Sequence, residues 1–267
     1  YIAQAINKAS STGINKVFLL PGTYKLNIPL SFGGGGDFTF CGSGDKTILE
    51  RHFSTSGQGV IHLDNLRHHV TIENLCIDGR KEAYTSGANH GILVQNGAGG
   101  SATIRNCEIY NNTDYGIRSV SYNYGKTGVT IESNYIHDNK NGLLGGDINT
   151  RNVLENNTVY GICTGKYFSW NTCKGSQYGI YTYGSSATII GNKLIDNEIG
   201  ICAKGKNAIL CGNFICRGSG TAADYTTAQK TIELTSESKN NVVTGNQCCG
   251  KDVTAAGEGN IVTDNNI

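Results

Sequence analysis

A repeat with a period near twenty residues is the feature that most limits how this chain of 267 residues can fold. Short β-type apolar pairs flank an asparagine, and Asn171, Asn192 and Asn213 follow one another at steps of 21 residues. The step from Asn213 to Asn246 is 33 residues, which predicts an additional loop within residues 217–240. A period of this length is typical of solenoids, whose units stack and share one continuous core.

A second marker, glycine followed by Ile or Leu, also repeats along the chain. It occurs at Gly91, Gly116, Gly142, Gly161, Gly179 and Gly200. Leucine-rich repeats need a dense Leu pattern that is missing here, and propeller blades need a longer period. The sequence therefore predicts an all-β fold, a parallel β-helix forming one domain over residues 1–267. We expect glycine at one corner of each coil, and asparagine at another in left-handed geometry, bonded to asparagine of the next coil.

Alternation along each strand predicts which side chains point inward. One expected inward row contains Ile104, Ile131, Ile189 and Leu210, and a second contains Ile109, Ile136, Leu194, Ile215 and Cys248. Residues 1–50 differ and read as an N-terminal cap and first coil. Tyr1 to Ala9 is an expected short capping helix with Ile2, Ala5, Ile6 and Ala9 on one face, and residues 17–20 are an expected buried strand. The helix would cover the open edge of the solenoid.

Composition excludes several other classes of protein. With 37 Gly the chain is a poor helix former, and 38% hydrophobic residues against 16% charged residues argue against disorder. A net charge of +1 gives no electrostatic basis for a nucleic-acid partner. No apolar run approaches the length of a membrane span.

Two segments carry a family resemblance. Ala5 with Val17-Phe18-Leu19-Leu20-Pro21-Gly22-Thr23-Tyr24, and then Val70-Thr71-Ile72-Glu73-Asn74-Leu75-Cys76-Ile77-Asp78-Gly79, resemble the pectate-lyase-like superfamily. The resemblance extends over nearly the whole chain. It implies a right-handed parallel β-helix and a group that includes polysaccharide lyases, glycosidases, mannuronan epimerases and phage tailspikes. It does not select one reaction, because the fold hosts many chemistries.

The motifs of individual enzyme families match only in part. Asn112-Thr113-Asp114 matches the first motif of the polygalacturonase-like enzymes, but the chain lacks their Asp-Asp pair. Tyr115-Gly116-Ile117 resembles bacterial mannuronan epimerases, whose following Asp-Pro-His is replaced here by Arg118-Ser119-Val120. Both departures leave the reaction open.

Stacking the coils in register brings polar residues together on the middle coils. Asp78, Tyr110 and His137 are expected to form one ladder, and Arg80, Asn112 and Asn139 another. The candidate catalytic set is Asp78, Arg80, His90, Asp114, Tyr115, Arg118, His137 and Asp138.

Three interpretations of this set stay open. In a uronic acid lyase or epimerase, Arg118 or Arg80 would neutralise the substrate carboxylate, His137 or His90 would be the base, and Tyr115 the acid. In a glycosidase, Asp114 would act with Asp138 or Asp78. In a structural or adhesive solenoid, these groups would instead form hydrogen bonds with backbone atoms of the turns.

Tyrosines form a second group of candidates. Tyr122, Tyr124, Tyr160, Tyr178, Tyr181 and Tyr183 are expected to bind substrate. Aromatic faces stack on sugar rings while the hydroxyl stays in water. The alternative is an aromatic stack that stiffens the solenoid.

Cysteines and acidic residues allow two further expectations. Cys173 and Cys248 are expected to be buried thiols, whereas Cys216 and Cys249 fall in neighbouring coils at a spacing that allows a disulfide. No zinc-type spacing of Cys and His occurs, and no metal ligand set is assigned. Ca²⁺ at Asp138, Asp147 or Asp196 stays open, although no loop has a calcium motif.

The sequence therefore predicts an extracellular or cell-surface protein that binds a polysaccharide along the side of the solenoid, with an oligomer left open. A lyase or epimerase acting on an acidic glycan is the first choice, and a non-catalytic surface or tailspike-like module is the second. An enzyme would gather its site in a groove between residues 80–90, 120–127 and 217–240.

Overall fold

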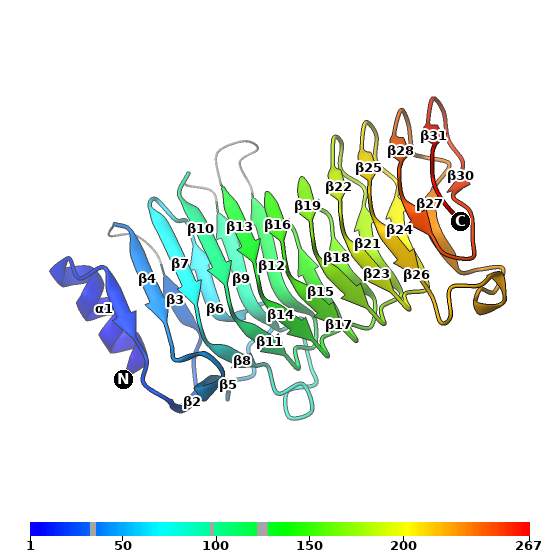
Figure 1. The fold of residues 1–267 in the computed structure, drawn as a ribbon. Helices are drawn as coiled ribbons and strands as arrows, with labels where there is room; N and C mark the ends of the chain where they lie inside the picture. Colours follow the sequence, from blue (N-terminus) through cyan, green and yellow to red (C-terminus); the bar gives the residue numbers. More distant parts are fainter. Residues whose placement is uncertain (33–35, 97–98, 122–127) are drawn as a thin grey trace. The chain divides into compact units, whose positions relative to one another are not determined.

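We describe a computed structural model over residues 1–32, 36–96, 99–121 and 128–267. It contains two compact units, residues 1–140 and 141–267, here called the N-terminal and C-terminal units. Within each unit the chain winds in coils, and successive coils contribute strands to three parallel sheets, A, B and C (Figure 1). In the described part of the chain, no helix has the length and apolar character needed to cross a membrane.

In the N-terminal unit, helix α1 (Ile2–Thr12) precedes the strands, and η1 (Gly44–Lys46) precedes β5. Sheet A contains β1 (Lys16–Phe18), β4 (Phe38–Cys41), β7 (His69–Glu73), β10 (Ser101–Arg105) and β13 (Val129–Glu132). Sheet B contains β2 (Gly22–Leu26), β5 (Thr47–Arg51), β8 (Cys76–Asp78), β11 (Glu108–Tyr110) and β14 (Tyr135–His137). Sheet C contains β3 (Leu30–Phe32), β6 (Gly59–Asp64), β9 (His90–Asn96) and β12 (Tyr115–Ser121).

The C-terminal unit repeats this arrangement. Sheet A contains β16 (Ile148–Thr150), β19 (Tyr167–Ser169), β22 (Thr188–Ile190), β25 (Ile209–Cys211), β28 (Val242–Thr244) and β31 (Ile261–Thr263). Sheet B contains β17 (Val153–Glu155), β20 (Thr172–Lys174), β23 (Lys193–Ile195), β26 (Phe214–Cys216) and β29 (Gln247–Cys248). Sheet C contains β15 (Asn141–Leu144), β18 (Tyr160–Cys163), β21 (Tyr178–Thr182), β24 (Ile199–Ala203), β27 (Lys230–Leu234) and β30 (Thr254–Ala255), with η2 (Ala222–Asp224) before β27.

The inward rows predicted from alternation are confirmed. Ile104 is level with Ile131 in sheet A, and Ile189 is level with Leu210. All members of both predicted rows are buried, and the most exposed of them, Ile215, is only 3% exposed. Because strand residues alternate between faces, the residues on either side of these rows lie on the outer surface of each sheet.

Asparagine ladders stabilise the corner between sheets A and B. In the C-terminal unit Nδ2 of Asn171 donates to Oδ1 of Asn192, and Nδ2 of Asn192 donates to Oδ1 of Asn213, both at 3.0 Å. The expected left-handed geometry at these asparagines is wrong. The residue before each one has the positive φ instead, as at Trp170 and Gly191. The left-handed residue turns the chain, so that the side-chain amide of the following asparagine points into the core. There the amide needs hydrogen-bond partners, because buried polar groups are costly without them.

The glycine of the Gly-Ile and Gly-Leu marker lies inside a sheet C strand, so its predicted corner position is wrong. A Cβ on Gly161 would lie 2.6 Å from the carbonyl oxygen of Gly179, and a Cβ on Gly179 would lie 2.6 Å from that of Gly200. Glycine is therefore required because successive coils approach too closely at this position for any side chain.

The N-terminal cap forms, with two differences from the expectation. Helix α1 buries Ile6 and Ala9, but Ala5 is exposed. Strand β1 is shorter than the predicted strand, and Phe18 is 52% exposed while Leu20 is 67% exposed. The segment therefore has outward as well as inward apolar residues, and the sequence pattern alone did not separate them.

Within residues 217–240 the structure has a loop, residues 217–229, followed by strand β27. In this loop Oδ2 of Asp224 accepts hydrogen bonds from the Thr221 N–H at 2.9 Å and from the Ser219 hydroxyl at 2.8 Å. Arg217 donates to the Asn197 carbonyl at 3.1 Å, which ties the loop to the preceding coil. β27 itself continues the regular ladder of sheet C.

Candidate functional site

Sheet C of the N-terminal unit presents a cluster of basic residue types on its outer face. His62 and Arg118 are both paired with Leu93, on β6 and β12 on either side of β9, so they occupy one outward row. His90 and Tyr115 are the first residues of β9 and β12, and both lie three residues before the Leu93–Arg118 pair. The repeat thus brings together residues from three coils that are far apart in sequence.

His90 lies at the centre of this cluster. Its side chain is 0% exposed, and its Nε2 lies 3.3 Å from Nη1 of Arg118. Its Nδ1 lies 3.8 Å from Oδ2 of Asp114 and 3.3 Å from the Tyr115 backbone N–H. Burial, followed by the charges of Arg118 and Arg51, lowers the pKa of His90 to about 3. His90 is therefore neutral at neutral pH.

This burial changes the role expected for His90. A buried imidazole cannot reach a substrate proton in this conformation, because a general base must come within hydrogen-bond distance of that proton. Its neutral Nε2 accepts from the Arg118 guanidinium in the tautomer that carries the ring hydrogen on Nδ1, whereas in the other tautomer Nδ1 accepts from the Tyr115 backbone N–H. The geometry makes His90 a positioning residue for Arg118.

Arg118 is half-buried, and its Nε is buried without a hydrogen-bond partner among the described residues. No carboxylate in the described ranges forms an ion pair with it. A guanidinium presents five N–H donors in a planar fork that matches a carboxylate. Arg118 can therefore take a carboxylate from outside the chain.

Two residues of this region were missed by sequence reasoning. Arg51, at the end of β5, is 0% exposed and donates to the carbonyls of Gln58 at 2.9 Å and His90 at 3.1 Å. Burial lowers the pKa of Arg51 to about 10. His62 Nε2 lies 2.9 Å from Oε1 of Gln95. His62 could have been found from the strand register. It follows the inward Ile61, so alternation places its side chain outward, in the same row as Arg118.

A second polar cluster lies on the outer face of sheet B. The predicted ladder of Asp78, Tyr110 and His137 is confirmed by the strand register. His137 is held between Asp138 Oδ2 at 2.7 Å and Glu108 Oε1 at 3.1 Å. Its ring stacks on Tyr110 with centroids 5.1 Å apart.

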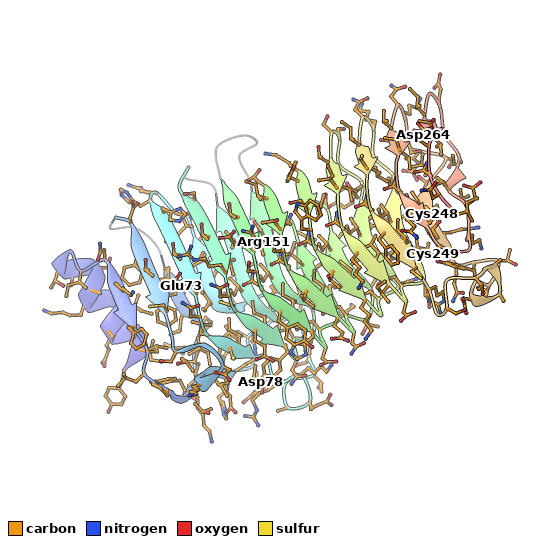
Figure 2. All side chains as sticks on the ribbon, in the orientation of Figure 1. Glu73, Asp78, Arg151, Cys248, Cys249 and Asp264 are labelled. Carbon is orange, nitrogen blue, oxygen red and sulfur yellow. The ribbon has the colours of Figure 1, made fainter. Side chains whose placement is uncertain are left out.

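Asp78 and Arg80 belong to this second cluster, with most of their polar groups in local contacts. Asp78 Oδ1 accepts the Arg80 N–H at 2.8 Å, and Arg80 Nη1 lies 2.7 Å from His52 Nε2. Arg80, like Asn111 and Asp138, has a left-handed backbone. The predicted ladder of Arg80 with Asn112 and Asn139 is therefore wrong by one residue, because Gly79 adds a position to this coil. Figure 2 labels Asp78 in this region.

The structure thus divides the predicted catalytic set between two sheets. His90, Asp114, Tyr115 and Arg118 gather at sheet C, whereas Asp78, Arg80, His137 and Asp138 gather at sheet B and its turn toward sheet C. The groups at sheet B already bond one another or the backbone, as the structural interpretation expects. At sheet C, in the group of His90, Asp114, Tyr115 and Arg118 (the Arg118 cluster), the Arg118 guanidinium still has an N–H donor, on Nε, that can bind a ligand.

Tyrosines form a separate cluster on sheet C of the C-terminal unit. Tyr160 and Tyr178 stack with centroids 5.5 Å apart, and Tyr181 lies 5.2 Å from Tyr160. Tyr183 lies 6.1 Å from Tyr181 and is 57% exposed. Burial raises the pKa of Tyr160, Tyr178 and Tyr181, so their hydroxyls stay protonated at neutral pH. Tyr122 and Tyr124 lie outside the described residues.

Among the described residues, no group of three or more His, Cys, Asp and Glu side chains is placed to hold a metal ion. Asp147 pairs with Lys166, and Asp196 accepts the Gly218 N–H at 2.9 Å. Ca²⁺ binding stays a prediction.

Comparison with known proteins defines the family. The model of the family described as "Right handed beta helix region" matches residues 31–144 and 59–267, and the chain belongs to this family. No curated protein matches this chain.

Solved structures share the fold at low identity. The Azotobacter vinelandii mannuronan C-5 epimerase AlgE4 A-module is 15% identical with a TM-score of 0.69, covering 100% of this chain and 94% of that chain. The Dettilon tailspike protein is 16% identical with a TM-score of 0.74, covering 99% of this chain and 62% of that one. The Azotobacter vinelandii AlgE6 A-module is 14% identical with a TM-score of 0.54, covering 98% of this chain and 91% of that chain. At these identities the likeness shows the fold alone.

Proposed function

We propose that this protein binds an acidic polysaccharide on the outer face of sheet C and acts on it as a lyase or an epimerase. The observation that carries the proposal is Arg118, a half-buried guanidinium with no carboxylate partner among the described residues, held by neutral His90. The charges of Arg118 and Arg51 both act on His90, so two cationic groups converge here. A uronate carboxylate would supply the missing negative charge.

The same cluster supplies groups for proton transfer. His62 is half-buried, and its Nε2 donates to Gln95 Oε1, so Nδ1 carries the lone pair of a base. With the uronate carboxylate on Arg118, the hydrogen on the adjacent carbon C5 becomes more acidic, and His62 removes it. In a lyase, the C4–O bond then breaks, a C4–C5 double bond forms, and the Tyr115 hydroxyl protonates the leaving oxygen. In an epimerase, the Tyr115 hydroxyl instead donates a proton to C5 from the face opposite His62, and His62 keeps the proton that it removed.

The AlgE4 A-module supports this choice of chemistry, since its name identifies it as a mannuronan C-5 epimerase. Tyr115-Gly116-Ile117 resembles the corresponding epimerase motif, while Arg118 departs from it. A polysaccharide substrate also favours a location outside the cell or on its surface.

A second candidate function is glycan binding without catalysis. The Tyr160, Tyr178, Tyr181 and Tyr183 cluster favours it, because aromatic faces bind sugar rings without any reactive group. The hydrolase alternative has weaker support: Asp78 and Asp138 bond their neighbours at sheet B, whereas Asp114 lies beside His90 at sheet C.

A panel of polyuronates tests the proposal. Ultraviolet absorbance detects unsaturated product from a lyase, and proton NMR detects inversion or solvent-hydrogen exchange at C5. We expect Arg118→Ala to reduce kcat/KM at least 100-fold, on the order of the loss of one charge-stabilising donor. Arg105→Ala is the matched control, because Arg105 lies on sheet A paired with Glu73. Full activity in Arg118→Ala would disprove the site.

The role of His62 and the second candidate function need separate variants. We expect His62→Gln to lower kcat with little change in KM, because glutamine lacks the base but keeps the hydrogen-bonding capacity of the side chain. If the whole panel shows no product but Tyr181→Ala weakens glycan binding in affinity electrophoresis, the non-catalytic function is supported. Tyr167→Ala on sheet A is the control for that binding measurement.

A further inference from the structure

The C-terminal unit carries two thiols side by side on the outer face of sheet B. Strand β26 pairs with β29 so that Ile215 is level with Cys248, and the Cys249 N–H donates to the Ile215 carbonyl at 2.9 Å. Cys216 and Cys249 are therefore the next pair in register. Ile215 and Cys248 are buried, so alternation places both following cysteines outward. Figure 2 labels Cys248 and Cys249 in this region.

Both residues are free thiols in the structure and both are half-buried. Burial, and then a hydrogen bond and the charge of Cys249, raise the pKa of Cys216. The two thiols are thus close enough to act on one another electrostatically. Directly opposed residues of neighbouring parallel strands lie within the Cα separation that a disulfide spans.

The 217–229 loop is folded over this pair. A Cβ on Gly220 would lie 3.2 Å from the Cys216 sulfur and 3.3 Å from Cβ of Cys249, so the glycine backbone covers both residues. Gly220 has a φ of 82°, which permits this approach. The Asp224 hydrogen bonds hold the loop in this shape.

We propose that Cys216 and Cys249 form a dithiol site that a hydroperoxide oxidises reversibly to a disulfide across the two coils. Because the raised pKa of Cys216 disfavours its thiolate, the Cys249 thiolate attacks the peroxide O–O bond; this gives a sulfenic acid on Cys249, and the other oxygen takes up the thiol proton and leaves as water or alcohol. The Cys216 sulfur then attacks the Cys249 sulfur, and the sulfenic oxygen leaves as water with the Cys216 proton. A thiol reductant reverses the step by exchange.

The other cysteines make the site selective. Cys41, Cys76, Cys107, Cys163, Cys173, Cys202 and Cys248 are buried. Cys211 is half-buried, but its partners in sheet A are Ile190 and Thr244, so it has no thiol beside it in the register. One disulfide is therefore expected among the ten cysteines.

The site does not depend on the proposed function, and thiol counting tests it. The folded, fully reduced protein is treated with hydrogen peroxide, quenched, unfolded and titrated for free thiols. We expect two thiols to be lost and peptide mapping to recover Cys216 linked to Cys249. The melting temperature should rise on the order of 5–10 °C and return after reduction, since the cross-link constrains the unfolded chain.

Three variants complete the experiment. Cys216→Ser and Cys249→Ser should abolish the rise in melting temperature, whereas Cys211→Ser, the matched control, should retain it. If the two cysteines remain as thiols, or become sulfinic acids without linkage, the proposal is wrong. The thiol count of each folded variant before oxidation separates a folding failure from a failure to react.

Discussion

The asparagine ladder should contribute a large share of the stability of the C-terminal unit, and Asn192→Ala measures it. Asn192 is 1% exposed. Its Oδ1 accepts from the backbone N–H and from Nδ2 of Asn171, both at 3.0 Å. Its Nδ2 donates to the Phe168 carbonyl and to Asn213 Oδ1, also at 3.0 Å. Alanine removes these four bonds, together with a longer one from Nδ2 to the Ile190 carbonyl at 3.2 Å, and replaces none.

The magnitude follows from the groups left without partners. The Asn171 N–H and the Phe168 carbonyl lose this buried partner, while Asn171 Nδ2 still donates to the Asn149 carbonyl. Each buried polar group left unsatisfied costs about 1–3 kcal/mol. Two such groups, together with the small cavity, predict a loss of about 4 kcal/mol in the free energy of unfolding.

Urea unfolding followed by two probes measures the loss. Far-ultraviolet circular dichroism reports the sheets, and the fluorescence of Trp170, the single tryptophan, reports the coil next to Asn171. Solenoids can unfold in parts, so the two transitions are compared as well as their midpoints. In Asn192→Ala we expect the urea midpoint of the Trp170 fluorescence transition to fall by at least as much as the midpoint of the dichroism transition.

Lys193→Ala is the control, because Lys193 is exposed on the same coil and its change should stay within about 0.5 kcal/mol. Asn192→Asp keeps the size of the side chain but replaces a donor with an acceptor facing the Phe168 carbonyl, so it should also destabilise. A loss below about 1 kcal/mol in Asn192→Ala, with coincident transitions, would refute the reasoning from unsatisfied groups.

Three further predictions concern packing and charge. Gly179→Ala should destabilise by about 3 kcal/mol or more in urea unfolding, because its Cβ would lie 2.6 Å from the Gly200 carbonyl oxygen; an unchanged midpoint would contradict the close approach of the coils. Phe168→Ala should cost about 3–5 kcal/mol by the same measurement, since Phe168 is 0% exposed; a loss under 1 kcal/mol would mean that the coil collapses around the cavity. His90 has a folded pKa of about 3, below its unfolded value, so the unfolded state binds the extra proton and stability falls as pH drops from about 6.5 toward 3. Urea midpoints measured across this range should fall less steeply in His90→Gln than in the natural chain, and equal slopes would show that His90 is not the cause.

The fold could be predicted because each coil repeats the same local choices. Ile131, Ile189 and Leu210 occupy equivalent positions, and a strand that slipped by one residue would turn its whole inward row to solvent. The period alone therefore determined the register of the strands. It also predicted the loop before β27, since the step from Asn213 to Asn246 exceeds one regular coil.

Corner geometry could not be predicted from residue type. Trp170 and Arg151 adopt the left-handed conformation, although neither residue favours it. Their position in the coil imposes the turn, and the stacked coils stabilise it. The same limit explains Arg80, whose place in the ladder shifted because one coil contains an additional residue, Gly79.

The sequence by itself determined the solenoid, its inward rows and the chemical types of the residues on its middle coils. Only the tertiary structure decided which of these residues meet. It placed His62 beside the Arg118 cluster and buried His90 beneath it, whereas His137 went to another sheet among carboxylates. The physical reason is that periodicity specifies the face and row of a residue, but side-chain burial and hydrogen bonding depend on neighbours from other coils, and these differ from coil to coil.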